Sequence, residues 1–222
     1  LSAKLVPDEK LEADQIATPR YLDIKSLDSP SVALSNALLE TVRMSEVLNR
    51  MFDTALSALR SKSTETLKLL KALDERLNTF QTAIQSYLVE LTQTQLSSTE
   101  ARRALEITLY VSNLEHAGDI IHLNLSDRIK ARAKESIEFN VEEQAALHDL
   151  CLIIHDNIRL ATGVLSSGDV EGAKRLIAQK DAFRKLENAV LDEHFRSDKQ
   201  AKRGALRRSA LYVDMIRDLH RI

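Results

Sequence analysis

Apolar residues recur every three or four positions along most of the chain, which is the spacing of a helix with one buried face. A clear example is the run that contains Leu48, Phe52, Ala55 and Leu59. The same spacing predicts helices at about 31–61, 63–94, 97–134, 141–165, 169–200 and 204–222. Long helices with short connections favour antiparallel neighbours. We therefore predict an all-α fold made of two tandem antiparallel three-helix bundles.

Breaks in the periodic pattern set the expected domain boundaries. Residues 1–29 mix Pro, Asp, Lys and Ser with little periodicity, which is typical of an extended lead-in or linker. Residues 30–138 are assigned to the first three-helix unit. Residues 139–222 are assigned to the second, and the two units share little similarity residue by residue.

Capping residues indicate where the helices start and end. Ser63 is the expected N-cap of the second helix and Asn140 that of the fourth. The cluster Ser97-Ser98-Thr99-Glu100 contains a capping box, with either serine as the N-cap. The stretch 166–169 is predicted to end the fourth helix and start the fifth, and Gly204 to separate the fifth from the sixth.

Composition supports the helical prediction. The chain has only five glycines and three prolines in 222 residues, and all three prolines lie within the first thirty positions. Too few turn residues remain for a fold rich in sheets. The body of the protein also lacks the residue that breaks helices most strongly.

Charge and cysteine content exclude several classes of function. The 31 Lys and Arg residues nearly balance the 33 Asp and Glu residues, so the formal net charge is −2. Such a chain lacks the positive surface that nucleic acids require, and we predict no nucleic-acid partner. The single cysteine, Cys151, excludes an internal disulfide framework, and its apolar neighbours indicate a buried, unreactive thiol.

The hydropathy of the chain bears on its cellular location. No stretch approaches the roughly 18 to 20 continuous apolar residues that cross a bilayer, so we expect this chain to be soluble. The first residue is Leu1 rather than Met. We therefore expect a piece of a longer polypeptide whose other part could be membranous.

The third predicted helix carries the most informative polar residues. Glu115, Asp119, His122 and Ser126 recur every three or four positions, about 100° around the helix from its apolar stripe. At a half-buried flank, two carboxylates one turn apart need a cation or a basic partner. Gly118 lacks a side chain and would let a neighbouring helix or a ligand approach closely. Pairing with Lys or Arg of a neighbouring helix and binding of a metal ion both remain open.

The segment Leu114-Glu115-His116-Ala117-Gly118-Asp119 resembles the Leu-Glu-Arg-Ile-Gly-Asp signature on the third helix of PhoU-type phosphate-uptake regulators, whose repeat is a three-helix bundle. The resemblance implies that Glu115 and Asp119 are ligands of a metal cluster, with iron, zinc or another divalent cation. His116 replaces the usual Arg.

Two further segments resemble one branch of that family, the cytoplasmic tails of bacterial sodium/phosphate cotransporters. They are the lead-in around Pro19-Arg20-Tyr21-Leu22-Asp23, followed by Glu40 and Arg43, and the closing segment 211–222. The resemblance implies a location at the cytoplasmic face of the membrane and the membrane portion of the same transporter as partner. Helical bundles with long exposed faces also often pair, so a homodimer is a further expectation.

The second repeat departs from the metal signature. Aligning its closing segment with the first motif puts His220 at the first ligand position and the second beyond Ile222, so the repeat is incomplete at its C-terminal end. Asp214 and Asp218 form their own pair one turn apart and are a second candidate metal site. Arg217 and Arg221 could instead neutralise this pair without a metal.

The second predicted helix offers partners for the first site. It carries a polar stripe with the same rhythm, formed by Asp74, Asn78, Gln81 and Gln85. The family often has two acids where Asp74 and Asn78 stand. Hard oxygen ligands suit Mg, Mn or Fe better than a thiophilic metal. Because this stripe is degenerate, we expect weak affinity and a site that could be empty as purified.

Enzymatic alternatives have little support in the sequence. Asp119-Ile120-Ile121-His122 supplies one of the two acid-x-x-His motifs that a ferritin-like di-metal site needs. His148-Asp149 and His155-Asp156 resemble the His-Asp pairs of helical phosphohydrolases, but such dipeptides arise easily by chance. No Ser/His/acid or Cys/His arrangement and no Gly-rich phosphate loop is evident. We predict a protein that is not an enzyme.

A basic cluster precedes and opens the sixth predicted helix. It comprises Lys199, Lys202, Arg203, Arg207 and Arg208. A solvated connector and a contact with anionic lipid headgroups are both compatible with it.

The function predicted is that of a cytosolic regulatory domain of a sodium-dependent phosphate transporter, which modulates phosphate uptake. The alternative is a stand-alone PhoU-type regulator or adaptor of phosphate uptake. A metal-dependent phosphohydrolase is the more distant alternative.

Overall fold

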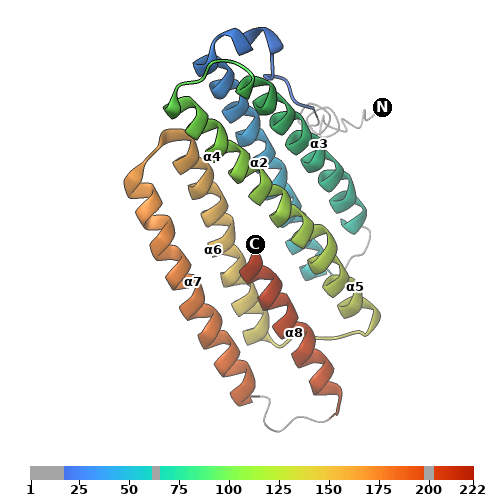
Figure 1. Cartoon of the computed structure of the whole chain (residues 1–222). Coiled ribbons are helices and arrows are strands. Elements are labelled where there is room, and N and C mark those ends of the chain that lie inside the picture. Colours follow the sequence, from blue (N-terminus) through green and yellow to red (C-terminus); the bar gives the residue numbers. More distant parts are fainter. Residues whose placement is uncertain (1–17, 62–65, 198–202) are drawn as a thin grey trace, which may run out of the picture.

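The computed structural model describes residues 18–61, 66–197 and 203–222. Over these ranges it contains helices only, which confirms the all-α prediction. The elements are η1 (Ile24–Asp28), α2 (Pro30–Ser61), α3 (Thr66–Thr92), α4 (Ser98–Asp119), η2 (Ile120–Leu125), α5 (Ser126–Lys134), α6 (Val141–Ser167), α7 (Val170–Ser197) and α8 (Arg203–Arg221). Because α4, η2 and α5 follow without a break, six long rods result (Figure 1).

The rods lie side by side in two groups (Figure 1). Helices α2, α3 and α4 contact one another, and α6 and α7 form a second pair that α8 joins. Helix α2 also contacts α6, so it links the two groups. In the described part of the chain, no helix is both long and apolar enough to cross a membrane.

Buried apolar side chains from both groups form one continuous core. Phe52 and Phe80 lie fully inside it in the first group, and Tyr212 of α8 is 1% exposed in the second. Each such side chain stabilises the fold by about 1.5 to 3 kcal/mol through its removal from water. The periodic apolar positions therefore become the interior surfaces of the rods.

Local hydrogen bonds at the helix ends confirm several predicted caps. Ser97 caps α4 and forms a capping box with Glu100, and Asn140 does the same for α6 with Glu143. Gly168 ends α6 in the left-handed conformation, with φ of 69°. The expected cap Ser63 lies outside the described residues.

One predicted boundary and the predicted conformation of the lead-in need correction. Gly204 lies inside α8, one residue after its start, instead of separating two helices. The lead-in is also not simply extended, because Ile24–Asp28 forms a 3₁₀ helix that Asp23 caps through its carboxylate. Short polar side chains such as Asp23 can organise a turn without any apolar periodicity. Gln200, the expected end of the fifth helix, lies outside the described residues.

A buried carboxylate holds the lead-in against α2. Glu40 is 0% exposed, and its Oε1 accepts hydrogen bonds from the backbone N–H groups of Arg20 and Tyr21. Arg43 Nη1 donates to Glu40 Oε2 at 2.8 Å and to the Thr18 carbonyl at 3.0 Å. The buried charge is thereby paired and hydrogen-bonded, as a charge inside a protein must be. We call these contacts the lead-in clamp.

The third rod is not a regular α-helix throughout. Over Ile120–Leu125 it widens into a π-helical turn, η2. Such single turns are rare and are found frequently at functional sites. In this chain the turn directly follows Asp119, so it sets the directions of His122 and Asn124 relative to the acidic residues on α4.

Candidate functional site

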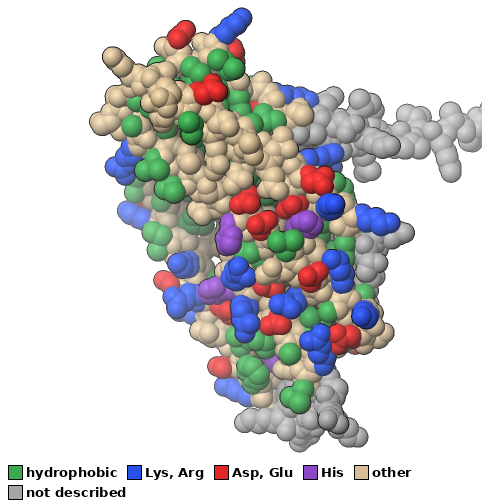
Figure 2. Space-filling view, turned by 45° about the vertical axis from the view of Figure 1, so that its right-hand side comes forward, with side chains coloured by type: hydrophobic (Ala, Val, Ile, Leu, Met, Phe, Trp, Pro, Cys, Tyr) green, Lys and Arg blue, Asp and Glu red, His purple; other side chains and the backbone are tan. Residues whose placement is uncertain are grey.

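Acidic side chains gather on both sides of η2. On one side lie Asp74 of α3, Glu115 and Asp119 of α4 and His122 of η2, which we call the α3–α4 acidic cluster. Glu115, Asp119 and His122 are half-buried, as their flanking position predicts. Red and purple side chains of this kind gather near the middle of the face in Figure 2.

One imidazole lies in direct contact with an acid of the α3–α4 acidic cluster. His122 Nδ1 lies 3.1 Å from Asp74 Oδ2. Burial nevertheless raises the pKa of Asp74 above its usual value, because it outweighs the lowering by the charge and hydrogen bond of His122. The charge of Asp119 raises this pKa further. The folded protein therefore disfavours the ionised form of Asp74.

Glu115 experiences the same kind of environment. Burial raises its pKa, and the negative charges of Asp119 and Asp74 add to the effect. A hydrogen bond with Gln81 lowers it in part. The charge of His116 also lowers it. Burial and the mutual repulsion of the three carboxylates nevertheless prevail, so one more positive charge near them would be stabilising.

The polar stripe predicted on the second helix faces α4 in part. Asn78 Nδ2 lies 3.5 Å from Asp74 Oδ2 on the same helix. Gln81 contacts Glu115 across the interface. Gln85 Nε2 donates to Ser112 Oγ at 3.1 Å. Asp74 and Gln81 therefore belong to the acidic cluster, whereas Gln85 joins the two helices further along.

Close packing at Gly118 brings α3 and α4 together. A Cβ atom at this position would collide with Leu77 Cδ2 of α3 and lie 3.7 Å from Met51 Cε of α2. The missing side chain thus lets neighbouring helices approach closely. The sequence alone allows either a helix or a ligand at this position. The close approach places Asp74, one turn before Leu77, near Asp119.

A second cluster of charges lies on the other side of η2 and differs in composition. Asp218 of α8 has a side chain only 4% exposed, yet Asn124 Nδ2 of η2 donates to its Oδ1 at 2.9 Å. Arg128 of α5 lies 3.4 Å from both Asp218 and Asp214. We call these residues, with Arg217 and Arg221, the α5–α8 charge cluster.

Two arginines of α8 complete the α5–α8 charge cluster. Arg217 Nη1 is 3.2 Å from Asp214 Oδ1, and Arg221 Nη1 is 3.8 Å from Asp218 Oδ1. Three guanidinium groups therefore surround two carboxylates. The neutralisation by arginines that the sequence suggests is present, and it is reinforced by Arg128 from another helix.

The donor atoms bear on the expected metal. Carboxylate oxygens and one imidazole suit a hard or borderline divalent cation such as Mg, Mn or Fe in their chemistry. Across residues 18–61, 66–197 and 203–222, however, no three His, Cys, Asp or Glu side chains are arranged as the ligands of one metal ion. Glu115, Asp119, Asp74, Asp214 and Asp218 thus remain predicted ligands, and the geometry supports no chemical step through a metal.

The other residues singled out in the sequence lie apart from these clusters. His148 is 3.8 Å from its neighbour Asp149, whereas His155 is 3.9 Å from Asp53 of α2, so the two His-Asp pairs are not equivalent. Burial raises the pKa of the Cys151 thiol to about 12, which accords with an unreactive side chain.

The basic cluster is only partly described. Arg207 forms a two-pronged ion pair with Glu135 at 2.7 and 2.8 Å, and Arg208 lies 3.8 Å from Glu143. These two arginines therefore contact α6 and the end of α5. Lys199 and Lys202 lie outside the described residues, as does the side chain of Arg203.

The structure also contains an arrangement that the sequence analysis missed. His194 Nδ1 of α7 lies 3.0 Å from Glu143 Oε1, and its Nε2 is 2.7 Å from Ser209 Oγ of α8. Although these contacts form an acid–His–Ser chain, His194 is 4% and Ser209 9% exposed. We interpret the chain as a structural link between α6, α7 and α8. A histidine on the inward face of α7 is the signal that could have revealed it.

Comparison with known families identifies the class of protein. Two stretches, residues 41–122 and 147–222, match the PhoU domain. Together they cover well over half of the chain, and each contains one of the two charge clusters in whole or part. The chain belongs to the PhoU domain family.

Full-length relatives are considerably longer than this chain. It is 31% identical over 222 residues to the "Putative inorganic phosphate export protein YjbB" of Salmonella typhimurium, and 30% identical over 223 residues to the protein of that name from Escherichia coli K12. In both cases 99% of the chain is aligned, and it spans 40% of the length of the relative.

Solved structures share the fold at low sequence identity. PhoU from Pseudomonas aeruginosa superimposes with a TM-score of 0.77 over 85% of this chain and 88% of its own, at 15% identity. The phosphate transport system regulatory protein PhoU from Streptococcus pneumoniae gives 0.74 over 87% and 89%, at 18% identity. These likenesses establish the PhoU-like helical arrangement.

Proposed function

We propose that this chain is a PhoU-type regulator that controls the movement of inorganic phosphate across a membrane. The observation that carries the proposal is the match of both halves of the chain to the PhoU domain. Two similar proteins are named for phosphate export, so the regulated direction includes export as well as the uptake that the sequence suggests. The role is binding and regulation, without a chemical reaction on phosphate.

The test of this function is a measurement of phosphate fluxes in the native host. Cells from which the coding region for residues 18–222 is deleted in frame are loaded with radioactive phosphate, and its uptake and release are followed. We expect at least a threefold change in one of the two rates, restored when the segment is supplied again. Unchanged uptake and release in the deletion strain would contradict the proposal.

A second, finer proposal is that the chain is the cytosolic regulatory domain of a sodium-dependent phosphate transporter. It is supported by the alignment of almost the whole chain with only 40% of the length of its relatives. The lead-in clamp also fits this role, since it ties residues 18–21 firmly to α2.

Sodium replacement separates the two forms of the proposal. If the chain acts as part of a sodium-dependent carrier, the flux change caused by the deletion disappears when choline replaces sodium in the medium. A flux change that is equal in sodium and in choline would favour the stand-alone regulator. The separately expressed chain should also sediment with membranes only when the remaining part of the carrier is present.

We further propose that the α3–α4 acidic cluster binds a hard divalent cation weakly. Its support is the mutual repulsion of Asp74, Glu115 and Asp119. The basic groups that act against the raised pKa values of Asp74 and Glu115 are His122 and His116. Cation binding to the folded state alone would raise the midpoint of thermal unfolding.

Titration with Mn²⁺ and elemental analysis test the cation proposal. We expect Mn²⁺ to raise the melting temperature of the wild type, and Asp74→Asn with Asp119→Asn to remove most of that rise. Asp127→Asn is a matched control, because Asp127 is an exposed acid of α5 that pairs with the nearby Lys130, away from the α3–α4 acidic cluster. An equal response in the wild type and the double variant would refute the site.

A further inference from the structure

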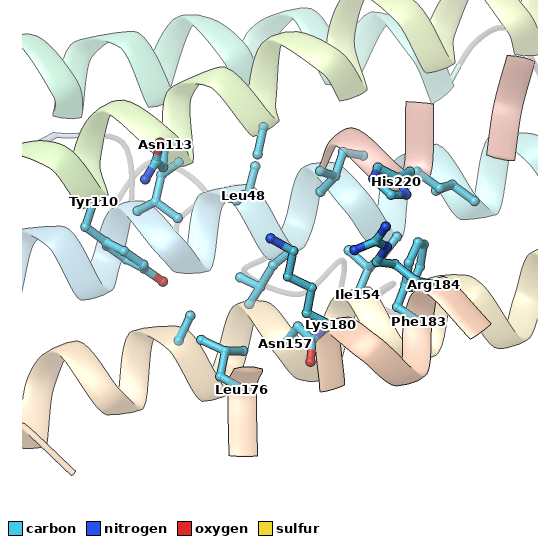
Figure 3. A pocket seen from close by; sticks show the side chains of 16 residues that line it. Leu48, Tyr110, Asn113, Ile154, Asn157, Leu176, Lys180, Phe183, Arg184 and His220 are labelled. Atoms are coloured by element: carbon cyan, nitrogen blue, oxygen red, sulfur yellow. The ribbon is translucent and has the colours of Figure 1, made fainter. Parts of the chain in front are cut away.

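A cavity of about 310 Å³ lies where the two groups of helices meet. Its walls come from α2 and α4 of the first group and from α6, α7 and α8 of the second (Figure 3). This volume is at the lower end of the range for sites that bind small molecules. The cavity is separate from both charge clusters, because none of the acids in those clusters lines it.

The floor of the cavity is apolar. It is formed by side chains of the core that are at most 9% exposed, namely Leu48, Leu114, Ile154, Ile158, Phe183 and Leu219. Aliphatic and aromatic groups of this kind provide a surface for the apolar body of a ligand. Inorganic phosphate, which has no such body, would gain nothing from the floor.

Two cations stand at the edge of the cavity. Lys180 and Arg184 lie one turn apart on α7, and Figure 3 shows Lys180 extending across the space toward α2 and α4. Neither has an ion pair or hydrogen bond with any residue described by the structure. The third basic group, His220 of α8, differs because its Nδ1 is 2.6 Å from Glu187 Oε2. The net charge at the edge is therefore positive.

A polar atom inside the wall has no partner. Asn157 Oδ1 of α6 is buried and accepts no hydrogen bond from any described residue. A buried acceptor without a donor loses the hydrogen bonds that it would make with water. Asn157 lines the cavity, so a donor group of a bound molecule could satisfy it.

We propose that this cavity binds a small organic anion with one phosphate or carboxylate head and an aromatic or aliphatic body. The head pairs with Lys180 and Arg184, and the body rests on the apolar floor. A hydroxyl or amine group of the ligand donates to Asn157 Oδ1. Such a ligand would contact both groups of helices at once. The inference goes beyond the proposed function and does not depend on it.

The test uses 1-naphthyl phosphate as the probe and isothermal titration calorimetry as the measurement. We expect one molecule to bind per chain. Inorganic phosphate represents the head alone and 1-naphthol the body alone, and each should bind at least tenfold more weakly. Absence of heat from 1-naphthyl phosphate at millimolar concentration, or equal affinity for inorganic phosphate, would overturn the proposal.

Variants then locate the binding event. Lys180→Gln with Arg184→Gln should weaken the probe at least tenfold, whereas Lys185→Gln, which removes an exposed cation of α7 outside the cavity, should leave it unchanged. Ala161→Leu keeps every charge but fills part of the cavity, and it should also prevent binding. If either cavity variant still unfolds cooperatively and binds the probe as tightly as the wild type does, the assignment is refuted.

Discussion

Two pairs of acids, each one helical turn apart, occupy opposite sides of the same π-helical turn and differ in what surrounds them. Asp214 and Asp218 on α8 meet three arginines and the amide of Asn124. Glu115 and Asp119 on α4 face a third acid, Asp74, with His122 beside Asp74 and His116 beside Glu115. The first pair is neutralised by the fold itself, whereas the second retains surplus negative charge.

This difference shows that spacing alone does not define an ion site. Both pairs have the same separation along a helix, and the groups that surround them, on the same helix and on its neighbours, decide whether the carboxylates are structural or available. Arginines explain the α8 pair without any ligand. The surplus charge on α4 costs stability, and it is the ground on which we propose a cation site there.

The largest effect on stability is expected when the neutralised pair on α8, Asp214 and Asp218, loses one of its acids. Asp218→Ala should lower the free energy of unfolding by about 2 to 3 kcal/mol, because Arg128 and Asn124 lose a hydrogen-bonded partner in a buried position. Urea unfolding followed by circular dichroism measures the change. A loss below about 0.5 kcal/mol would show that the α5–α8 charge cluster is not structural.

The next effect concerns the packing that brings Asp119 near Asp74. Gly118→Ala should be less stable than Gly163→Ala by about 2 kcal/mol, because only Gly118 lies against a neighbouring side chain. Gly163 has no atom within 4 Å of an added Cβ, so alanine there should stabilise α6 by about 0.5 to 1 kcal/mol. Thermal unfolding of the two variants gives the comparison, and equal stabilities would contradict it.

The pH dependence of stability offers a third comparison. The pKa values of Asp74 and Glu115 are raised in the folded state, so the folded chain binds more protons than the unfolded chain in the range just above the ordinary values. Their contribution to stability is therefore present at low pH and is lost as the pH rises through the raised values.

The double variant Asp74→Asn with Glu115→Gln isolates this contribution from the other acids. Relative to the wild type, we expect the variant to be more stable at pH 7.5 than at pH 5, as judged by melting temperatures. Comparing the variant with the wild type at each pH also cancels the effect on stability of surface acids whose pKa values are lowered, such as Glu106 and Glu135. That effect has the opposite pH dependence. If the melting temperature of the variant relative to that of the wild type stays constant, or increases toward pH 5, the raised pKa values of the two acids are contradicted.

The smallest effect is expected from the uncompensated pair itself. Asp119→Asn should raise the free energy of unfolding by about 0.3 to 0.5 kcal/mol in the absence of divalent cations, because it removes repulsion with Glu115 one turn away. Chemical unfolding in a chelating buffer measures it. Destabilisation by this variant under those conditions would mean that Asp119 has a favourable partner in the fold.

Local patterns explain why much of the fold is predictable from the sequence. The capping box at Ser97 and the N-cap at Asn140 need only residues within one turn, and both are present as the sequence indicates. Apolar periodicity likewise depends on one helix at a time. The rods could therefore be located without knowledge of their neighbours.

The charge clusters could be predicted only in part, because their members come from separate helices. The spacing of Glu115 and Asp119 is visible in the sequence, but the contact of Arg128 with Asp218 joins positions 90 residues apart. The π-helical turn could not be predicted either, since an extra residue in a turn leaves no change in the apolar pattern that distinguishes it from a normal helix. The cavity between the two groups depends in the same way on how the rods assemble.

The lead-in clamp has a mechanical consequence. Tension applied to the backbone at Thr18 would be resisted first by Arg43 and then by Glu40, both on α2, which contacts α3, α4, α5 and α6. A pulling force at that point would therefore pass to α2 and to the helices packed against it, instead of peeling the lead-in away from the fold.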